Sequence, residues 1–323
     1  MKNHLYPIKF QPILKEKIWG GTKLKTILNK KSDASNVGES WEISDVDGDT
    51  SIVSNGELKG VTLKQLLSTY QEELIGKKNF EQFGEKFPLL IKFIDAKEDL
   101  SIQLHPNDEL AAKRHNSFGK TEMWYVMQAD NDANLIVGFN QKVTPEVYLE
   151  HLENKTLPKI LNFDNVSEGD TYFIEVGRVH AIGAGVMLAE IQQTSDITYR
   201  VYDWDRKDDE GNERELHNDL AIEAIDFDMK EDFRVAYSKK EGQENNMVSC
   251  PYFTTNYIHL TKSISKVNRY DSFIIYMCVE GEAKVTIEGF SETIKKGETI
   301  LIPAALKELE LDSNNAKLLE VYV

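Results

Sequence analysis

The sequence predicts a mainly β fold built from two repeated units with short helical inserts. Short runs of aromatic and β-branched residues alternate with Gly, Asn and Asp, a pattern typical of strands joined by tight turns. The block Gly169–His180 recurs as the block Gly297–Glu308, which indicates an internal repeat. No apolar run approaches the roughly 20 residues that a membrane-spanning helix needs, so the chain is not expected to cross a membrane.

The composition limits the possible partners. The chain has 323 residues, and its 38 Lys and Arg against 54 Asp and Glu give a formal net charge of −16. Sequence-independent binding to nucleic acid needs a dense basic face, and an anionic membrane surface repels an acidic protein. We therefore expect no nucleic-acid partner and no membrane partner. The sequence leaves the oligomeric state open.

The start of the chain and its cysteines bear on the compartment. The first residues, Met1–Pro7, lack the apolar stretch of a signal peptide, which predicts a cytoplasmic location. Cys250 and Cys278 are the only cysteines. They are too few for a disulfide framework and lack the spacing of a thiolate zinc site. Both are expected to be core thiols, so the question of a metal site rests on the seven histidines.

Three helices are expected as inserts between the strands. Residues 62–65 have the pattern of a capping box, apolar residues follow at helical spacing as far as Leu74, and Gly76 is the expected end. A second helix is predicted to begin at the Thr-Pro pair 144–145, because Pro suits the first helical position. A third is predicted near Glu215–Phe227.

A polar stretch divides the chain. Residues 238–246 have the sequence SKKEGQENN, with no apolar residue, and are predicted to be a linker. The predicted domains are therefore 1–237, with the helical inserts, and 238–323, which contains the linker and the second repeat.

Both copies of the repeat resemble a motif of the cupin superfamily, Gly-x5-Pro-x-Gly-x2-His. The first copy has Glu175 in place of Pro and keeps His180. The second copy keeps the Pro but has Ala305 and Glu308 in place of Gly and His. The resemblance implies two cupin-type jelly-roll domains, of which only the first keeps the histidine.

A second pair of blocks extends the repeat upstream. Tyr125–Gln128 resembles Tyr276–Val279 at an offset of 151 residues. At this offset Phe273 falls at the position of Glu122. The second domain is therefore expected to lack the metal ligands and to have a structural role.

A period-two alternation places three polar side chains on one face of a predicted strand. Ser101, Gln103 and His105 share that face. Unpaired buried polar groups are costly, so the face is either a half-exposed edge or part of a site. Glu122 opens a predicted core strand and His180 ends the first turn motif. Together, Gln103, His105, Glu122 and His180 supply two imidazoles, a carboxylate and an amide oxygen, which suits Zn²⁺ or a similar divalent ion.

Several motifs occur in order along the chain. They are Ile18–Gly21, Gly38–Glu42, Ser101–Pro106, Gly119–Tyr125, Gly177–Ala181 and Glu190–Arg200. Together they resemble type I mannose-6-phosphate isomerase, the zinc-dependent phosphomannose isomerase family, over most of the chain up to about residue 205. The overall length is similar to that of the short bacterial form, which lacks the additional helical domain of longer members.

The resemblance implies roles for individual residues and makes 1–237 the catalytic, metal-binding domain. Longer members have a Tyr two residues after the last His ligand, where this chain has Ile182. Trp41 and Glu42 are expected at the rim of the pocket. The implied ligands of one zinc ion per chain are Gln103, His105, Glu122 and His180; the implied catalytic residues are Arg200, Glu190 and Lys120; the implied substrate-binding residues are Ser101, Lys92, Lys120 and Arg200.

The implied reaction interconverts an aldose phosphate and a ketose phosphate, mannose 6-phosphate and fructose 6-phosphate, through an enediol. Zinc either polarises the sugar oxygens or only holds the substrate. The proton is moved either by Glu190 or by a zinc-bound water, with Arg200 stabilising the enediolate. The alternative for these two side chains is a structural salt bridge between them. The sequence does not decide which cation holds the phosphate.

Two other functions compete with the isomerase. One is a metal-cupin oxygenase with iron held by two histidines and a carboxylate. The other is a non-catalytic sugar-phosphate sensor, which would bind without turnover. The Gln103 ligand, Lys120 and Arg200 favour a phosphosugar enzyme over an oxygenase.

Overall fold

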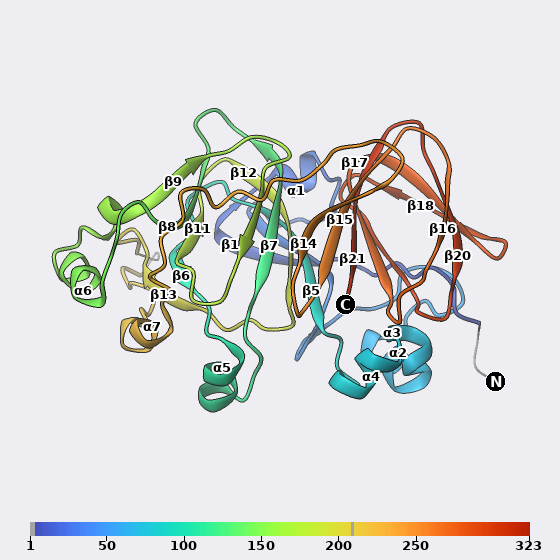
Figure 1. Cartoon of the computed structure of the whole chain (residues 1–323), viewed down its shortest axis with the longest axis horizontal. Coiled ribbons are helices and arrows are strands. Elements are labelled where there is room, and N and C mark those ends of the chain that lie inside the picture. Colours follow the sequence, from blue (N-terminus) through green and yellow to red (C-terminus); the bar gives the residue numbers. More distant parts are fainter. Residues whose placement is uncertain (1–3, 208–209) are drawn as a thin grey trace.

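The chain forms two β-barrels that lie side by side, with most helices at the edges (Figure 1). The computed structural model describes residues 4–207 and 210–323. The prediction of a mainly β protein with two cupin-type jelly rolls and short helical inserts is confirmed. No helix in the described ranges is long and apolar enough to cross a membrane.

Two antiparallel sheets form the first barrel and enclose a hydrophobic cluster between them. The first sheet has the order β1 (Ile13–Gly21), β2 (Val37–Ile43), β5 (Leu89–Asp95), β12 (Val186–Gln193), β7 (Glu122–Ala129), β10 (Thr171–Ile174). The second has the order β13 (Tyr199–Tyr202), β6 (Ile102–Leu104), β11 (His180–Ile182), β8 (Asn134–Phe139), β9 (Leu161–Asn165). A small hairpin joins β3 (Asp45–Val46) and β4 (Asp49–Thr50).

One eight-stranded sheet curls into the second barrel. Its long strand β17 pairs with four others, β18, β19, β20 and β21. The strands are β14 (Glu244–Ser249), β15 (Thr254–Leu260), β16 (Ile264–Val267), β17 (Ile274–Ile287), β18 (Phe290–Lys295), β19 (Thr299–Ile302), β20 (Glu308–Asp312) and β21 (Ala316–Tyr322).

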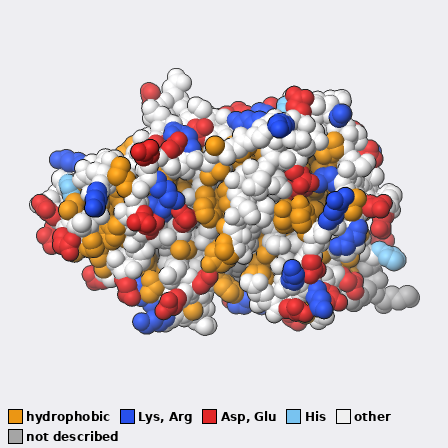
Figure 2. All heavy atoms as spheres, viewed as in Figure 1, with side chains coloured by type: hydrophobic (Ala, Val, Ile, Leu, Met, Phe, Trp, Pro, Cys, Tyr) orange, Lys and Arg blue, Asp and Glu red, His pale blue; other side chains and the backbone are white. Residues whose placement is uncertain are grey.

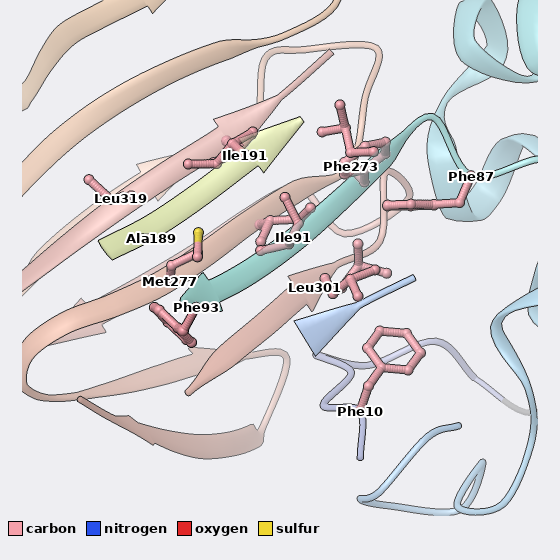
Figure 3. Packing of buried hydrophobic residues seen from close by; sticks show 14 of the residues in the cluster. Phe10, Phe87, Ile91, Phe93, Ala189, Ile191, Phe273, Met277, Leu301 and Leu319 are labelled. Atoms are coloured by element: carbon pink, nitrogen blue, oxygen red, sulfur yellow. The ribbon is translucent and has the colours of Figure 1, made fainter. Parts of the chain in front are cut away.

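A large hydrophobic cluster joins the two barrels (Figure 3). The six-stranded sheet contributes the fully buried Ile91, Phe93 and Ile191 from its outer face. The second barrel contributes Met277 and Leu319, which are also fully buried. Since the inner face of the same sheet lines the first barrel, both of its faces are covered. The second barrel thus supports this sheet from behind.

Helix α2 (Leu63–Tyr70) begins with the predicted capping box. The Gln65 N–H donates to Thr62 Oγ1, and the Thr62 N–H donates to the Gln65 side chain. The prediction of one continuous helix ending at Gly76 is wrong, because Gln71 has a φ of 49° and separates α2 from α3 (Glu72–Ile75).

The other two predicted helices are found at the expected positions, but one of them is shorter than predicted. Helix α6 (Pro145–Glu153) begins as predicted, with Thr144 Oγ1 accepting from the Val147 N–H. Helix α7 (Asn218–Ala224) is shorter than predicted, because Ile225 takes an extended conformation. The remaining helices are α1 (Lys23–Thr26), α4 (Lys77–Phe83), α5 (Asp108–His115) and the 3₁₀ turn η1 (Leu157–Ile160).

The predicted linker is shorter than expected, because β14 already begins at Glu244. Asn245 is buried there despite its polarity, since its amide donates to the backbone carbonyls of Lys240 and Tyr257. A polar run can therefore contain a strand when its amides find backbone partners.

The two copies of the repeat occupy equivalent strands, but the upstream offset of 151 is wrong by one residue. Thr171 in β10 faces Tyr125 in β7, and Thr299 in β19 faces Met277 in β17. Since the two threonines are equivalent in the turn motif, Tyr125 corresponds to Met277 at an offset of 152. A one-residue slip exchanges the two faces of a strand, so the correction changes which residues face inward.

The corrected register moves Phe273 out of the second barrel. Ile274 takes the position of Glu122 and belongs to the cluster inside that barrel. Phe273 lies in the cluster between the barrels instead, with its ring centroid 4.7 Å from that of Phe87. Phe273 therefore links the two halves.

Phe273→Ala is expected to destabilise the protein by about 3–5 kcal/mol, because it leaves a cavity in the hydrophobic cluster that joins the two barrels, here called the joint. Urea denaturation measures the loss. Val267→Ala is the control, since Val267 lies in the same barrel but is 52% exposed, and we expect a change within about 0.5 kcal/mol. Equal stability of the two variants would contradict this account of the joint.

The acidic excess is not gathered into one patch on the face that Figure 2 shows. Acidic and basic side chains alternate there, with hydrophobic side chains between them. The net charge of −16 therefore says little about the local field at any one site.

Candidate active site

Strand register in the six-stranded sheet gathers one half of the predicted site. Glu190 in β12 lies between Lys92 in β5 and Trp124 in β7. Its neighbour on the same face, Gln192, lies opposite Glu122. Because side chains alternate along a strand, these groups share the inner face of the barrel.

The five-stranded sheet contributes the other half of the predicted site residues. Gln103 in β6 lies opposite His180 in β11 and opposite Arg200 in β13. His105 follows directly after β6, and Ser101 directly precedes it. The predicted site residues from both sheets therefore meet inside the first barrel.

Three of the four predicted ligands form a tight, buried group. Ligand atoms of His105, Glu122 and His180 all lie within 4.8 Å of one another. The Nε2 atoms of both histidines are 3.5 Å from the Glu122 carboxylate oxygens. Glu122 Oε1 is buried and has no hydrogen-bond partner within the described residues. A buried carboxylate oxygen without a partner is costly, and a cation between these groups would satisfy it.

The histidines are held in the state that metal binding requires. Nδ1 of His105 is 2.9 Å from the Ile197 carbonyl oxygen, and Nδ1 of His180 is 2.8 Å from the Arg178 carbonyl oxygen. A proton on each Nδ1 leaves the Nε2 lone pair facing Glu122. Burial holds the pKa of His105 well below its usual value and lowers that of His180 to about 3, so both rings are neutral. The donor set fits a divalent ion such as zinc.

Gln103 and Lys120 lie next to this group. The Gln103 amide is 3.5 Å from His180 Nε2. The Lys120 ammonium donates to Glu122 Oε2 at 2.6 Å and to His105 Nε2 at 3.0 Å. Burial and the nearby Glu190 raise the pKa of Glu122 to about 7, so the positive charge of Lys120 helps to keep this carboxylate ionised.

Glu190 is held by two partners. Lys92 Nζ is 3.0 Å from Glu190 Oε1, and the Trp124 indole N–H donates to Oε2 at 3.0 Å. Burial opposes ionisation of Glu190, but Lys92 and Lys120 outweigh it and lower the pKa to about 2. Glu190 is therefore a carboxylate at neutral pH.

The alternative salt bridge between Glu190 and Arg200 is not formed. Arg200 Nε donates to Ser101 Oγ at 3.3 Å, and Nη1 donates to the Glu215 carbonyl oxygen at 2.8 Å. The sequence did not indicate that Lys92, the cation in the neighbouring strand, would be the partner of Glu190. Arg200 is partly buried and lines the cavity beside the metal ligands.

A cavity of about 260 Å³ opens onto these groups. Trp41 lines it as predicted, and Ile182 lines it as well. Glu42 does not, because it points to the other face of β2 and accepts from Lys30 at 2.6 Å. The cavity is also lined by residues that were not predicted as site residues: Lys17, Trp19, Glu39, Ile94, Leu100, Asp196, Thr198 and Arg214. Trp19, Glu39, Asp196 and Thr198 lie within the motifs that carry the family resemblance, whereas Lys17 and Arg214 lie outside them.

Since the resemblance implies that Glu190 is catalytic, Trp124→Phe is expected to lower kcat about 10- to 100-fold with little change in KM. The change removes the N–H that orients Glu190 but keeps an aromatic ring beside His180, and a hydrogen bond to a charged group contributes about 1.5–3 kcal/mol. Trp19→Phe is the matched control, since Trp19 lines the same cavity and its indole N–H has no hydrogen-bond partner among the described residues. Equal kcat values for the two variants would contradict this role.

These features define the class: a two-barrel cupin protein with a candidate metal site buried in one barrel. Residues 8–133 match the family model "Phosphomannose isomerase type I, catalytic domain", and residues 243–323 match "Mannose-6-phosphate isomerase, cupin domain". The chain belongs to the type I mannose-6-phosphate isomerase family.

Two relatives and one solved structure are similar to this chain over nearly all of its length. Mannose-6-phosphate isomerase ManA of Bacillus subtilis is 37% identical over 95% of this chain and 96% of its own. Mannose-6-phosphate isomerase of Streptococcus mutans is 33% identical over 95% of this chain and 96% of its own. The crystal structure of the mannose 6-phosphate isomerase from Bacillus subtilis superimposes with a TM-score of 0.89, at 30% identity, covering 99% of this chain and all of that one.

Proposed function

We propose that this protein interconverts mannose 6-phosphate and fructose 6-phosphate with one bound zinc ion. The observation that carries the proposal is the shared cavity. The ionised Glu190 and Arg200 line a space of about 260 Å³ together with Gln103 and Lys120. Gln103 and Lys120 in turn contact the buried, neutral His180 and His105. This combination suits an anionic sugar whose oxygens are polarised while a proton is moved.

The metal is proposed to be held by the following side chains: Gln103, His105, Glu122 and His180. Zinc at this position would supply Lewis-acid polarisation of the sugar oxygens. Lys120 contacts two of the ligands directly, so its role is to balance charge beside the metal and to face the substrate from there.

Glu190 is proposed to move the proton between C2 and C1 of the sugar. Lys92 keeps its carboxylate ionised at neutral pH, and Trp124 fixes its orientation. Negative charge then develops on the enediol oxygens, and the guanidinium of Arg200 is proposed to stabilise it. Among the cations that could hold the phosphate, Lys92 is already paired with Glu190 at 3.0 Å, which argues for Arg200 instead.

The phosphate is proposed to bind at Arg200 and Ser101. Their side chains bond to each other at 3.3 Å and both line the cavity. An arginine can bind a phosphate through two parallel hydrogen bonds, and a serine hydroxyl can add a third.

The division of labour between the barrels is also a proposal. We assign residues 1–237 to the catalytic domain and residues 238–323 to a supporting domain without metal ligands. The joint formed by Phe273 and its neighbours supports this assignment, because it covers the back of the catalytic sheet. The cytoplasmic location stays a prediction.

A coupled assay for fructose 6-phosphate formation tests the function. The zinc-loaded protein should convert mannose 6-phosphate, and glucose 6-phosphate serves as the comparison sugar. Oxygen consumption with an iron-loaded protein would favour the oxygenase instead. Binding of mannose 6-phosphate without any conversion would favour the sensor and contradict the isomerase.

A further inference from the structure

A second cavity, of about 570 Å³, lies between the two barrels. We call it the interbarrel cleft; its walls are Lys9–Pro12, Leu14, Leu28–Lys31, Glu42 and Ser54 on one side and Lys295, Lys296, Glu298 and Thr299 on the other. It shares no lining residue with the candidate active site. Strand β2 separates the two spaces, with Trp41 facing the active site and Glu42 facing the cleft.

The cleft concentrates positive charge in an acidic protein. Two adjacent lysine pairs, Lys30–Lys31 and Lys295–Lys296, line it from opposite barrels, and Lys9 adds a fifth ammonium. Only two carboxylates, Glu42 and Glu298, are among the lining residues. The whole chain carries a net charge of −16, so this local excess runs against the overall composition. Like charges gathered in one concave space repel unless an anion lies among them.

Both carboxylates are already engaged. Lys30 and Glu42 form a buried ion pair at 2.6 Å, and Lys9 lies 2.9 Å from Glu298. Lys31 and Lys296 form no side-chain hydrogen bond and no ion pair within the described residues. They are the two lysines of the cleft that have no directly paired carboxylate within the described residues.

A buried hydroxyl without a partner also belongs to the wall of the cleft. Thr299 is 5% exposed and lines the cleft, and its Oγ1 has no hydrogen-bond partner within the described part of the chain. Leaving a buried polar group unpaired costs about 1–3 kcal/mol. A ligand oxygen beside the Lys296 end of the cleft would satisfy it.

The rest of the wall is apolar. Phe10, Leu14 and Leu28 line the cleft on the side of the first barrel. A site of several hundred Å³ with an apolar wall and a few converging polar groups is typical of small-molecule binding. The size and the wall leave room for an organic body beside a charged group such as a phosphate.

We propose that the interbarrel cleft binds a phosphorylated small molecule. Lys31 and Lys296 take its phosphate from opposite sides, the Thr299 hydroxyl meets one of its oxygens, and the apolar wall covers its body. Because the two lysines belong to different barrels, the occupant connects them and stabilises the folded protein.

Inorganic phosphate is the probe, and its effect on the melting temperature is the measurement. The Arg200→Ala variant removes the proposed phosphate contact in the active site, so any remaining effect reports another site. We expect phosphate to raise the melting temperature of this variant by an amount that grows with the logarithm of its concentration above the dissociation constant.

Adding Lys31→Glu and Lys296→Glu should raise at least tenfold the phosphate concentration that is needed for a given rise in melting temperature. The matched control adds Lys59→Glu and Lys262→Glu, two exposed lysines elsewhere that change the net charge equally, and should leave the effect intact. The same pairs of substitutions in the wild-type background repeat the comparison if the Arg200→Ala variant folds poorly. An equal loss in the cleft pair and the control pair, or no phosphate effect beyond the active site, would overturn the proposal.

Discussion

Removal of the metal with a chelator is expected to lower kcat for mannose 6-phosphate at least a thousandfold and to leave the fold intact. The proposed ligands face one another inside a barrel whose hydrophobic clusters do not depend on them. Lewis-acid stabilisation of a developing oxyanion contributes several kcal/mol, and each 1.36 kcal/mol is a factor of ten in rate. Steady-state kinetics before and after dialysis against the chelator, with circular dichroism, measure both effects.

Two variants connect this loss to the proposed site. His180→Ala should abolish both metal content and turnover, because it removes a ligand whose Nε2 faces Glu122. His151→Ala is the control. His151 lies in the peripheral helix α6 and contacts Thr156 just after that helix, so metal content and turnover should be unchanged. Full turnover by the metal-free protein would contradict the assignment of the metal to catalysis.

Glu190→Gln is expected to lower kcat at least a thousandfold while metal content stays the same. Glutamine has the shape of glutamate and can still accept the Trp124 N–H, but it cannot take up the proton. KM should change only a few-fold, because Glu190 is proposed to act on the reacting carbons rather than on the phosphate.

The buried partner of Glu190 requires a second variant. Glu190→Gln leaves Lys92 with an unpaired charge inside the barrel, and breaking a buried ion pair costs about 3–5 kcal/mol. Glu190→Gln combined with Lys92→Met removes that charge and should recover stability without recovering turnover. If the double variant regained activity, the loss in the single variant would be structural. Normal turnover of Glu190→Gln itself would remove this residue from the mechanism.

Much of the candidate site could be predicted, because strand periodicity fixes which side chains share a face. The alternation around Gln103 placed it on one face with Ser101 and His105, and the structure brings these residues to the cavity or to the metal ligands. The partner of Glu190 could not be predicted in the same way. It depends on which strand lies next to β12, and the sequence carries no signal for that neighbour.

Other parts of the site come from segments that are distant in sequence. Glu39 and Lys17 reach the cavity from the first two strands, and Arg214 from the segment after β13. Arg214 is positioned by an ion pair with Asp203 at 2.5 Å. In the sequence, Arg214 looks like any charged residue of a solvated loop. Only its contact with Asp203 in the folded structure shows that it belongs to the site.

The two barrels also share a buried carboxylate at equivalent positions, which the sequence motifs do not reveal. Glu320 in the second barrel is fully buried, lies between Asn256 and Tyr276 in register, and accepts from Tyr276 at 2.7 Å. This is the position that Glu190 has beside Trp124 in the first barrel. A glutamate therefore occupies the same place in both barrels. Because the residues around it differ between the barrels, a comparison of residue types does not detect this equivalence.

Titration of the metal-free protein with zinc, while conversion of mannose 6-phosphate is recorded, tests the central claim most directly. We predict that turnover rises in proportion to added zinc and reaches its plateau at one ion per chain, and that Glu190→Gln binds the same amount of zinc without turnover. Turnover that is complete before any zinc is added, or a fully zinc-loaded protein that does not convert the sugar, would contradict the account.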